Sequence, residues 1–243
     1  MNNNLANIKK SIFFLNKNEC VAIPTETVYG LAANAYSSKS VKKIYSLKKR
    51  PRNNPSIVHY SSLNQLKKDC ELNKNFLILY KKFCPGPITF ILKKKINSKI
   101  KPLASANLKT IAIRFPNHKI TRTILKKIKF PLAMPSANKS FNVSPVTAKD
   151  VFEEFKKKIK LIINGGRSKI GLESTVIDLT SAPKILRPGV IEKNSIEKVL
   201  NLKLKRNIKN KLLKSPGLMK KHYSPGIPVF INQKRHLKKR AFI

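Results

Sequence analysis

The stretch V-A-I-P-T-E-T-V-Y-G-L-A-A-N-A, residues 21–35, carries the most information about the fold. The short apolar run at 20–24 predicts a buried strand that ends at Pro24. Two threonines then enclose Glu26, although the whole chain has only 11 acidic residues. We expect a turn from this strand into a helix. Thr27 would either cap that helix or face a ligand.

Outward from this stretch, apolar periodicity predicts helices and strands along the chain. Helices are expected at 5–15, 38–48, 76–83, 119–128, 147–157 and 196–200. Strands are expected at 56–60, 88–92, 110–115, 131–135, 161–163, 174–179, 184–187 and 229–231. Because strands and helices are interspersed without strict alternation, the prediction is an α/β fold with a mixed sheet.

The charge of the chain is extreme, with 52 Lys and Arg against 11 Asp and Glu and a formal net charge of +41. Such a field favours polyanions, namely nucleic acid, nucleotides or an anionic membrane surface. The alternative is that much of the lysine forms a solvated surface without a particular partner, because the bias toward Lys, Asn and Ile suggests a genome poor in G and C. Residues 201–243 contain 13 of the basic residues and no acid.

Cysteine and histidine spacing gives no sign of a metal site or a disulfide framework. The three cysteines show no C-x-x-C pair, and the four histidines show no paired spacing. No apolar run approaches the length of a membrane span, and the N-terminus lacks a signal peptide's apolar block. We therefore expect a cytoplasmic protein that does not contact a membrane and has no protein-only metal site.

Small polar and basic residues cluster at the ends of the predicted strands, where open α/β sheets bind ligands. The clusters are P-T-E-T-V-Y-G at 24–30, K-K-R-P-R-N-N-P-S-I-V-H at 48–59, T-I-A-I-R-F-P at 110–116, P-S-A-N-K-S-F-N-V-S-P at 135–145, and E-S-T-V with L-R-P-G at 173–176 and 186–189. Each cluster alone has a structural explanation as a cap, a turn or a solvated charge. Together they indicate a site for an anion with a planar or bidentate group.

In this order, the motifs resemble those of the YrdC-type threonylcarbamoyl-AMP synthases, over roughly residues 10–231. H-Y-S-P at 222–225 is similar to the linker of the longer members. The resemblance implies a YrdC-like twisted mixed sheet with flanking helices and a positively charged concave site. It also implies a catalytic domain at 1–200, followed at 201–243 by a basic linker and tail, the remnant of a truncated C-terminal extension.

The resemblance implies a nucleotidyltransferase that converts L-threonine, bicarbonate and ATP into threonylcarbamoyl-AMP and pyrophosphate. It assigns L-threonine to Thr27, His59, Arg114, the main chain at Met134, and Ser174. It assigns ATP to Arg50, Asn54, Thr110, Ser136, Ser144, Arg187 and Tyr223, and catalysis to Lys48 and Arg50. Mg²⁺ would be carried by ATP. Glu26 could hold magnesium through water, orient neighbouring donors or be structural.

The implied partners are the tRNA threonylcarbamoyl transferase proteins that use the product, with a possible contact to tRNA itself. The proline-rich 215–229 segment, which carries Tyr223, is the candidate lid. Phe141 departs from the family pattern, which usually has glycine there, so the loop leading to Ser144 is expected to differ. Two alternatives stay open: a non-catalytic RNA-binding module of YrdC type, and a carbamoyl-transfer enzyme of the hydrogenase-maturation type.

Overall fold

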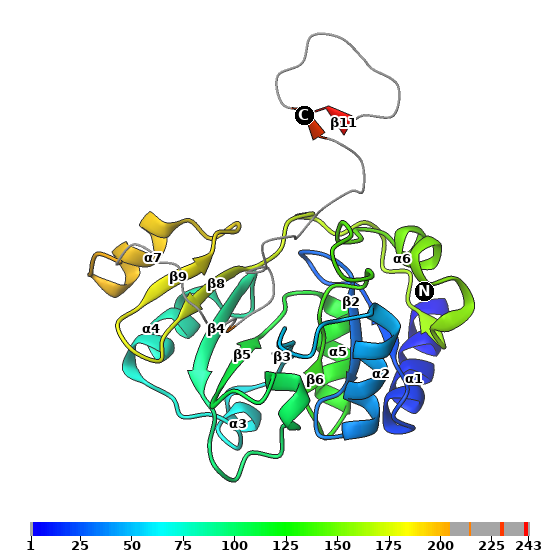
Figure 1. The fold of residues 1–243 in the computed structure, drawn as a ribbon, viewed down its shortest axis with the longest axis horizontal. Helices are drawn as coiled ribbons and strands as arrows, with labels where there is room; N and C mark the ends of the chain where they lie inside the picture. Colours follow the sequence, from blue (N-terminus) through cyan, green and yellow to red (C-terminus); the bar gives the residue numbers. More distant parts are fainter. Residues whose placement is uncertain (1, 205–213, 215–228, 231–240, 243) are drawn as a thin grey trace.

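A nine-stranded mixed sheet forms the centre of the molecule (Figure 1). The computed structural model describes residues 2–204, 214, 229–230 and 241–242. The strands lie in the order β7-β1-β2-β6-β3-β5-β4-β8-β9. Their bounds are β1 Val21–Ile23, β2 Gly30–Asn34, β3 Ile57–His59, β4 Ile88–Lys93, β5 Thr110–Arg114, β6 Leu132–Ala133, β7 Leu161–Ile162, β8 Thr175–Asp178 and β9 Lys184–Arg187.

Parallel and antiparallel pairs occur together in this sheet, which confirms the predicted mixed α/β fold. β1 with β7, β3 with β5, and β4 with β8 are parallel. The remaining neighbours are antiparallel. Because of this mixture, the C-terminal ends of β3 and β5 lie beside the N-terminal ends of β4 and β8.

The segment at 21–35 forms two strands, so the expected strand-to-helix turn is wrong. β1 and β2 are antiparallel, with Ile23 opposite Gly30, and residues 24–29 form the connection between them. The apolar run after Gly30 is buried on both of its faces, with Leu31, Ala32 and Ala33 fully enclosed. Thr27 therefore lies in a strand connection and caps no helix.

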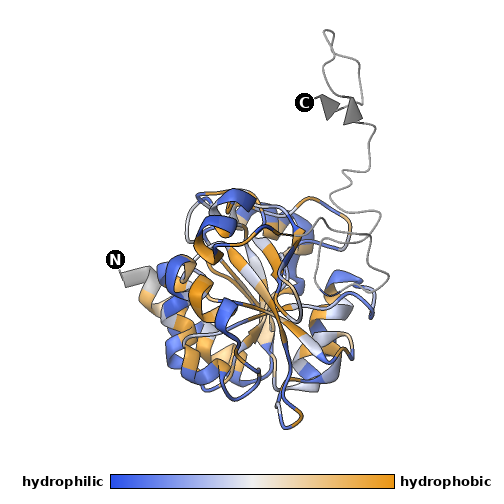
Figure 2. Cartoon of the chain, turned by 90° about the vertical axis from the view of Figure 1, so that its left-hand side faces the viewer, coloured by the Kyte–Doolittle hydropathy of each residue, from blue (hydrophilic) through white to orange (hydrophobic). Residues whose placement is uncertain are grey.

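Helices flank the sheet on both sides, and their apolar faces point inward (Figure 2). The helices are α1 Asn2–Asn16, α2 Ser38–Lys48, α3 Leu63–Leu66, α4 Lys74–Phe83, α5 Lys119–Lys127, α6 Ala148–Phe155 and α7 Lys193–Leu200, with 3₁₀ turns η1 Pro102–Ser105 and η2 Lys156–Lys158. Thr147 begins α6 with a capping box. Its hydroxyl accepts from Asp150 N, and the Asp150 carboxylate accepts from Thr147 N.

The two-residue period of the strands divides the core into separate clusters. In β1, Val21 and Ile23 pack with α1 and α5 on one face, while Ala22 joins the larger cluster that α2, α4, α6 and α7 cover. A third cluster lies on the sheet face opposite this larger one. In the part of the chain that the structure describes, strands alone build it, from Ile57, Ile91, Ala112, Val176 and Leu186. This sheet face is where a ligand can approach the strands.

Part of the basic tail is described. β10 Val229–Phe230 pairs in parallel with β11 Ala241–Phe242, and β10 lies within the strand predicted at 229–231. The Lys214 ammonium forms an ion pair with the buried Asp178 carboxylate at the end of β8, at 2.9 Å. The candidate lid at 215–228, with Tyr223, lies outside the described residues. Within the described ranges, none of the helices has the length and apolar character that crossing a membrane requires.

A buried carboxylate distant from the predicted site holds several loops together. Asp69 is fully buried and accepts hydrogen bonds from the hydroxyls of Tyr36 (2.7 Å), Tyr60 (3.0 Å) and Ser98 (2.8 Å) and from Lys99 N (3.2 Å). The Tyr60 hydroxyl is buried and the other donors are partly buried, so the carboxylate replaces much of the water that would otherwise satisfy them.

The variant Asp69→Asn is expected to lower the free energy of unfolding by about 1–3 kcal/mol, because an amide cannot accept all four hydrogen bonds. Urea denaturation followed by circular dichroism measures the change. An unchanged unfolding midpoint would show that the network contributes little.

Candidate active site

Three polar side chains form a row across neighbouring strands on the face of the third cluster. His59 in β3 lies opposite Arg114 in β5, and Arg114 lies opposite Thr89 in β4. Directly opposed residues on one sheet face have Cβ atoms about 4.5–5.5 Å apart. All three residues are buried, although each carries a polar or charged group. The strand register therefore brings together two predicted threonine ligands and adds Thr89, which the sequence did not single out.

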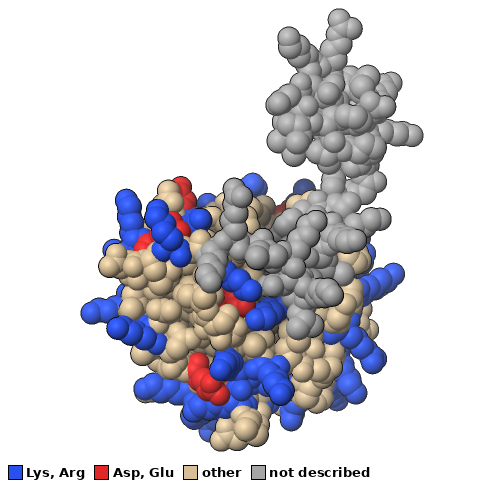
Figure 3. Space-filling model, turned by 60° about the vertical axis from the view of Figure 1, so that its left-hand side comes forward, with Lys and Arg blue, Asp and Glu red and all other residues tan. Residues whose placement is uncertain are grey.

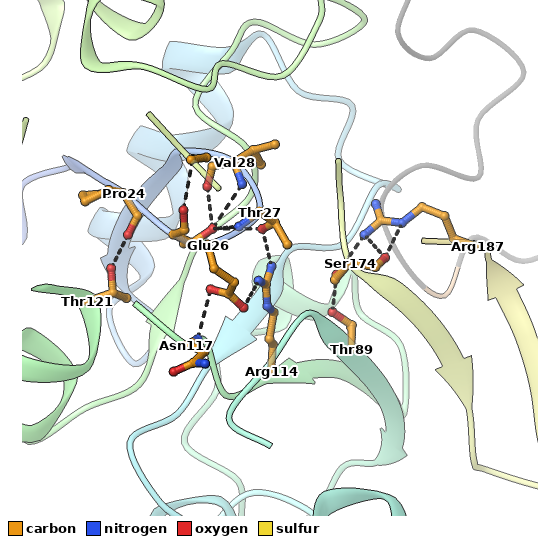
Figure 4. A network of polar contacts seen from close by, with 12 residues as sticks. Pro24, Glu26, Thr27, Val28, Thr89, Arg114, Asn117, Thr121, Ser174 and Arg187 are labelled. Carbon is orange, nitrogen blue, oxygen red and sulfur yellow. Dashed lines mark hydrogen bonds and ion pairs between the residues drawn. The ribbon is translucent and has the colours of Figure 1, made fainter. Parts of the chain in front are cut away.

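Glu26 lies against Arg114 in this row (Figure 4). One Glu26 oxygen accepts from Arg114 Nη2 at 2.6 Å, and the other accepts from the backbone N of Asn117 at 3.0 Å. The side chains of Arg114 and Glu26 are only 5% and 9% exposed. Of the three roles considered for Glu26, the contacts match orientation of a neighbouring donor. Arg114 Nε is buried and has no partner among the described residues.

Thr27 is held between Thr25 and Arg114, and this limits what its hydroxyl can do. Thr25 Oγ1 donates its single proton to the Val28 carbonyl at 2.6 Å. The 2.9 Å contact between the two threonine hydroxyls therefore uses the proton of Thr27. Thr27 Oγ1 also accepts from Arg114 Nη1 at 2.9 Å. Its remaining lone pair can only accept a hydrogen bond from a ligand.

On the other side of the row lie Ser174 and Arg187 (Figure 4). The Ser174 hydroxyl is 2.8 Å from that of Thr89, and Arg187 donates to Ser174 through Nε and Nη2. Arg187 also forms a short ion pair with Glu173, whose other oxygen accepts from the Ser144 hydroxyl at 2.8 Å. Ser144 is thus brought to the site through Glu173, which the sequence analysis did not assign.

These groups surround a small hollow. The predicted residues that line it are Thr27, His59, Arg114, Met134, Ser136, Ser174 and Arg187. All five expected threonine ligands are among them. The N–H of Met134 donates to the Ile57 carbonyl at 2.9 Å, so a main-chain contact from Met134 to a ligand would use its carbonyl oxygen.

Lys48 and Arg50 lie beside the hollow without lining it. The Lys48 ammonium is 1% exposed and donates to the carbonyls of Ser136, at 2.6 Å, and Asn138. Arg50 donates to the Asn54 carbonyl at 2.9 Å, the Asn54 side-chain oxygen at 2.7 Å and the Pro55 carbonyl at 2.6 Å. Burial, followed by the charge of Arg50, holds the pKa of Lys48 well below its usual range.

Thr110 begins β5 and Asn54 precedes β3. Both therefore lie at the other end of the strand pair from His59 and Arg114, which end β3 and β5. Ile57 is level with Ala112 in the parallel pair of β3 and β5, so Thr110 is close to the segment that precedes β3. Neither Asn54 nor Thr110 lines the hollow. The expected ATP ligands are therefore divided: Ser136 and Arg187 lie at the hollow, Ser144 reaches it through Glu173, and Asn54, Arg50 and Thr110 lie beyond it.

His59 is the only histidine in the row, and it is neutral. Burial and then the nearby positive charge of Arg114 hold its pKa well below the ordinary value. Nδ1 is 3.3 Å from the Ile57 carbonyl, a distance that fits donation by the Nδ1–H tautomer. A neutral imidazole beside Arg114 adds no charge to the hollow. No group of ligands suited to a metal ion occurs in the part of the chain described.

The loop after Ser136 contains Phe141 in a strained conformation. Phe141 takes φ +80°, which glycine adopts readily and which costs other residues free energy. A difference between this loop and the family pattern stays a prediction. The Asn138 amide donates to the carbonyls of Lys139 and Asn142, and Ser140 N donates to Lys48 O. These bonds hold the loop in place around a strained residue.

Comparison with known proteins agrees with this geometry. The family model Sua5_yciO_yrdC, described as "Telomere recombination", matches residues 14–189. The chain belongs to the Sua5/YciO/YrdC family. A second model, the C-terminal domain of threonylcarbamoyl-AMP synthase, matches residues 191–242. The proposed division at residue 200 remains a prediction.

Individual members of the family are similar over most of the chain. The threonylcarbamoyl-AMP synthase of Pyrococcus abyssi is 41% identical over 90% of this chain, and that of Bacillus subtilis is 39% identical over 92%. The chain spans 65% and 66% of their lengths. The crystal structure of P. abyssi Sua5 complexed with L-threonine matches with a TM-score of 0.86 at 39% identity, covering 92% of this chain and 67% of that one.

The strain at Phe141 can be tested in this Sua5/YciO/YrdC member by Phe141→Gly. Positive φ costs a non-glycine residue about 1–2 kcal/mol, and the greater freedom of glycine in the unfolded chain offsets part of that gain. We expect the variant to be more stable by about 0.5–1 kcal/mol in chemical denaturation. Phe141→Ala is the control and should show no gain, because alanine also disfavours positive φ. Equal stabilisation by both substitutions would contradict the explanation.

Proposed function

We propose that this chain is a threonylcarbamoyl-AMP synthase. It would combine L-threonine, bicarbonate and ATP into threonylcarbamoyl-AMP and pyrophosphate. The observation that carries the proposal is the buried row of His59, Arg114 and Thr89, with Thr27 and Ser174 at its sides, around one hollow. The family relationship and the L-threonine complex of the P. abyssi relative give independent support.

L-Threonine would occupy the hollow, and the site supplies partners for each of its polar groups. Arg114 lines the hollow and offers guanidinium donors to the carboxylate. Thr27 Oγ1 can accept a hydrogen bond from the amine, because its own proton is committed to Thr25. The neutral His59 and the Ser174 hydroxyl could form hydrogen bonds with the substrate hydroxyl and so orient the substrate.

ATP would lie across the outer edge of the hollow, beside Ser136 and Arg187. Arg50 would offset phosphate charge and the charge that develops at the α-phosphorus, and Arg187 would donate hydrogen bonds to the nucleotide. Lys48 would act as a positioning residue, since its ammonium holds the Ser136 and Asn138 carbonyls. Asn54, Thr110 and Ser144 remain predicted ATP contacts, and Tyr223 is predicted to reach the nucleotide from the segment outside the described residues.

The reaction needs positioning more than a protein base. The threonine amine and bicarbonate combine to a carbamate with loss of water. A carbamate oxygen then attacks the α-phosphorus, the new P–O bond forms, and the bond to the departing pyrophosphate breaks. Holding both reactants in line supplies much of the acceleration. Exclusion of water from the hollow would protect the mixed anhydride from hydrolysis.

Mg²⁺ would enter with ATP and neutralise phosphate charge. The donors at the site fit this arrangement, because both carboxylates near the hollow are already engaged by arginine. The product would pass to a tRNA threonylcarbamoyl transferase. The RNA-binding alternative rests on charge alone, and Lys and Arg are spread over much of the face in Figure 3 without forming a single band.

Pyrophosphate release tests the proposal. The purified full chain, supplied with Mg²⁺ and ATP, should release pyrophosphate only when L-threonine and bicarbonate are both present. The expected nucleotide product is threonylcarbamoyl-AMP, identified by mass spectrometry. Release without threonine, or tight RNA binding with no release at all, would favour one of the alternatives.

The location of threonine is tested by Gly30→Ala. A Cβ at Gly30 would lie 2.4 Å from Cγ and 2.8 Å from Sδ of Met134, and both residues line the hollow. The methionine side chain must therefore move, and the hollow shrinks. We expect the KM for threonine to rise about tenfold, equivalent to about 1.4 kcal/mol, with a much smaller change in the KM for ATP. Equal effects on both substrates would place threonine elsewhere.

A further inference from the structure

Both arginines at the hollow carry a resident carboxylate. Glu26 pairs with Arg114, and Glu173 pairs with Arg187. All four side chains are at most 11% exposed, so water screens neither pair well. The chain has 11 acidic residues against 52 basic ones, yet two of the acids are placed here. This is the opposite of what a general anion site would need.

Glu26 is positioned to act on Arg114 and not on a ligand. It lies behind the guanidinium and is not among the residues that line the hollow. Its second oxygen is fixed by Asn117 N, which holds the carboxylate in place. Arg114 therefore presents fixed N–H donors to the hollow while its charge is offset at 2.6 Å. His59, also beside Arg114, is kept neutral.

Lys48 and Arg50, the cations beside the hollow, have no such carboxylate partner among the residues described. Within the described chain, Lys48 and Arg50 have only carbonyl and amide oxygens as hydrogen-bond partners, and no carboxylate lies within ion-pair distance of either. In this part of the chain no direct counter-ion offsets their charge, and only the more distant Glu173 acts on both. The site therefore has a neutralised half at the hollow, where each arginine has its own carboxylate, and a cationic half around Arg50 beside it.

From this division we infer that Glu26 determines which substrate enters the hollow. An amino acid is a zwitterion and needs donors for its carboxylate but no net positive charge. A polyphosphate or another multiply charged anion needs net charge to offset the loss of its hydration. By neutralising Arg114, Glu26 admits the zwitterion and leaves phosphate groups to the cationic half. Specificity of this kind comes from weakening the binding of multiply charged anions as much as from binding the amino acid.

This inference rests on the proposed function for the identity of the amino acid, but its electrostatic part can be measured separately. Glu26→Gln removes the negative charge and keeps the shape. Arg114 then becomes an uncompensated buried cation that multiply charged anions can neutralise. Sulfate is the probe, because it carries two charges and takes no part in the reaction.

The experiment measures competition between sulfate and threonine at constant ionic strength. One assay follows the inhibition of pyrophosphate release by sulfate at several threonine concentrations. The other measures binding of sulfate and of threonine by isothermal titration calorimetry. In the wild type, sulfate should not compete with threonine. In Glu26→Gln it should become competitive with threonine, with an inhibition constant lowered at least tenfold, while the KM for ATP changes less than about twofold. Asp69→Asn, the same chemical change at a buried carboxylate outside the site, controls for lost stability.

A merely structural role for Glu26 predicts that Glu26→Gln and Asp69→Asn both lower the melting temperature and that sulfate competes with threonine in neither. That result would overturn the inference. Strong competition by sulfate in the wild type would overturn it as well, even if Glu26→Gln failed to fold. If the wild type released no pyrophosphate, the proposed function would fail. Calorimetry with sulfate on both proteins would still decide whether Glu26 excludes anions.

Discussion

The strand register that places His59, Arg114 and Thr89 in one row is the constraint on which the site depends. The row exists because β3 and β5 are parallel while β4 runs against them. Strand ends that carry different motifs therefore meet on one sheet face. In the part of the chain that is described, strands alone build the apolar cluster next to the row. A slip of one residue in any of these strands would turn its polar side chain to the other face.

Burying this row requires that its charge be balanced. An arginine that is only 4% exposed as a residue would be costly without a partner. Glu26 meets that need for Arg114, and Glu173 meets it for Arg187. The same two contacts fix the direction of the guanidinium groups. Stability and recognition therefore depend on the same atoms, and a basic chain can still form a nearly neutral hollow.

Much of the fold follows from local sequence. Apolar periodicity and caps located α1, α2, α5 and α6 within a few residues, because amphipathic helices leave a clear pattern. The second strand of the 21–35 segment was missed, because a short run buried on both faces resembles the start of a buried helix. The family motifs singled out five residues that line the hollow, whereas Thr89 and Glu173 have no distinctive local signal.

The sequence by itself determined the family, the mixed α/β class and the set of polar residues at strand ends, because these depend on order and spacing along the chain. The tertiary structure alone decided which of those residues meet. It paired Glu26 with Arg114 and committed the Thr27 proton to Thr25, and it turned the Lys48 ammonium toward backbone carbonyls. Such contacts join residues up to 90 positions apart, and strand register and burial set them while local propensity does not.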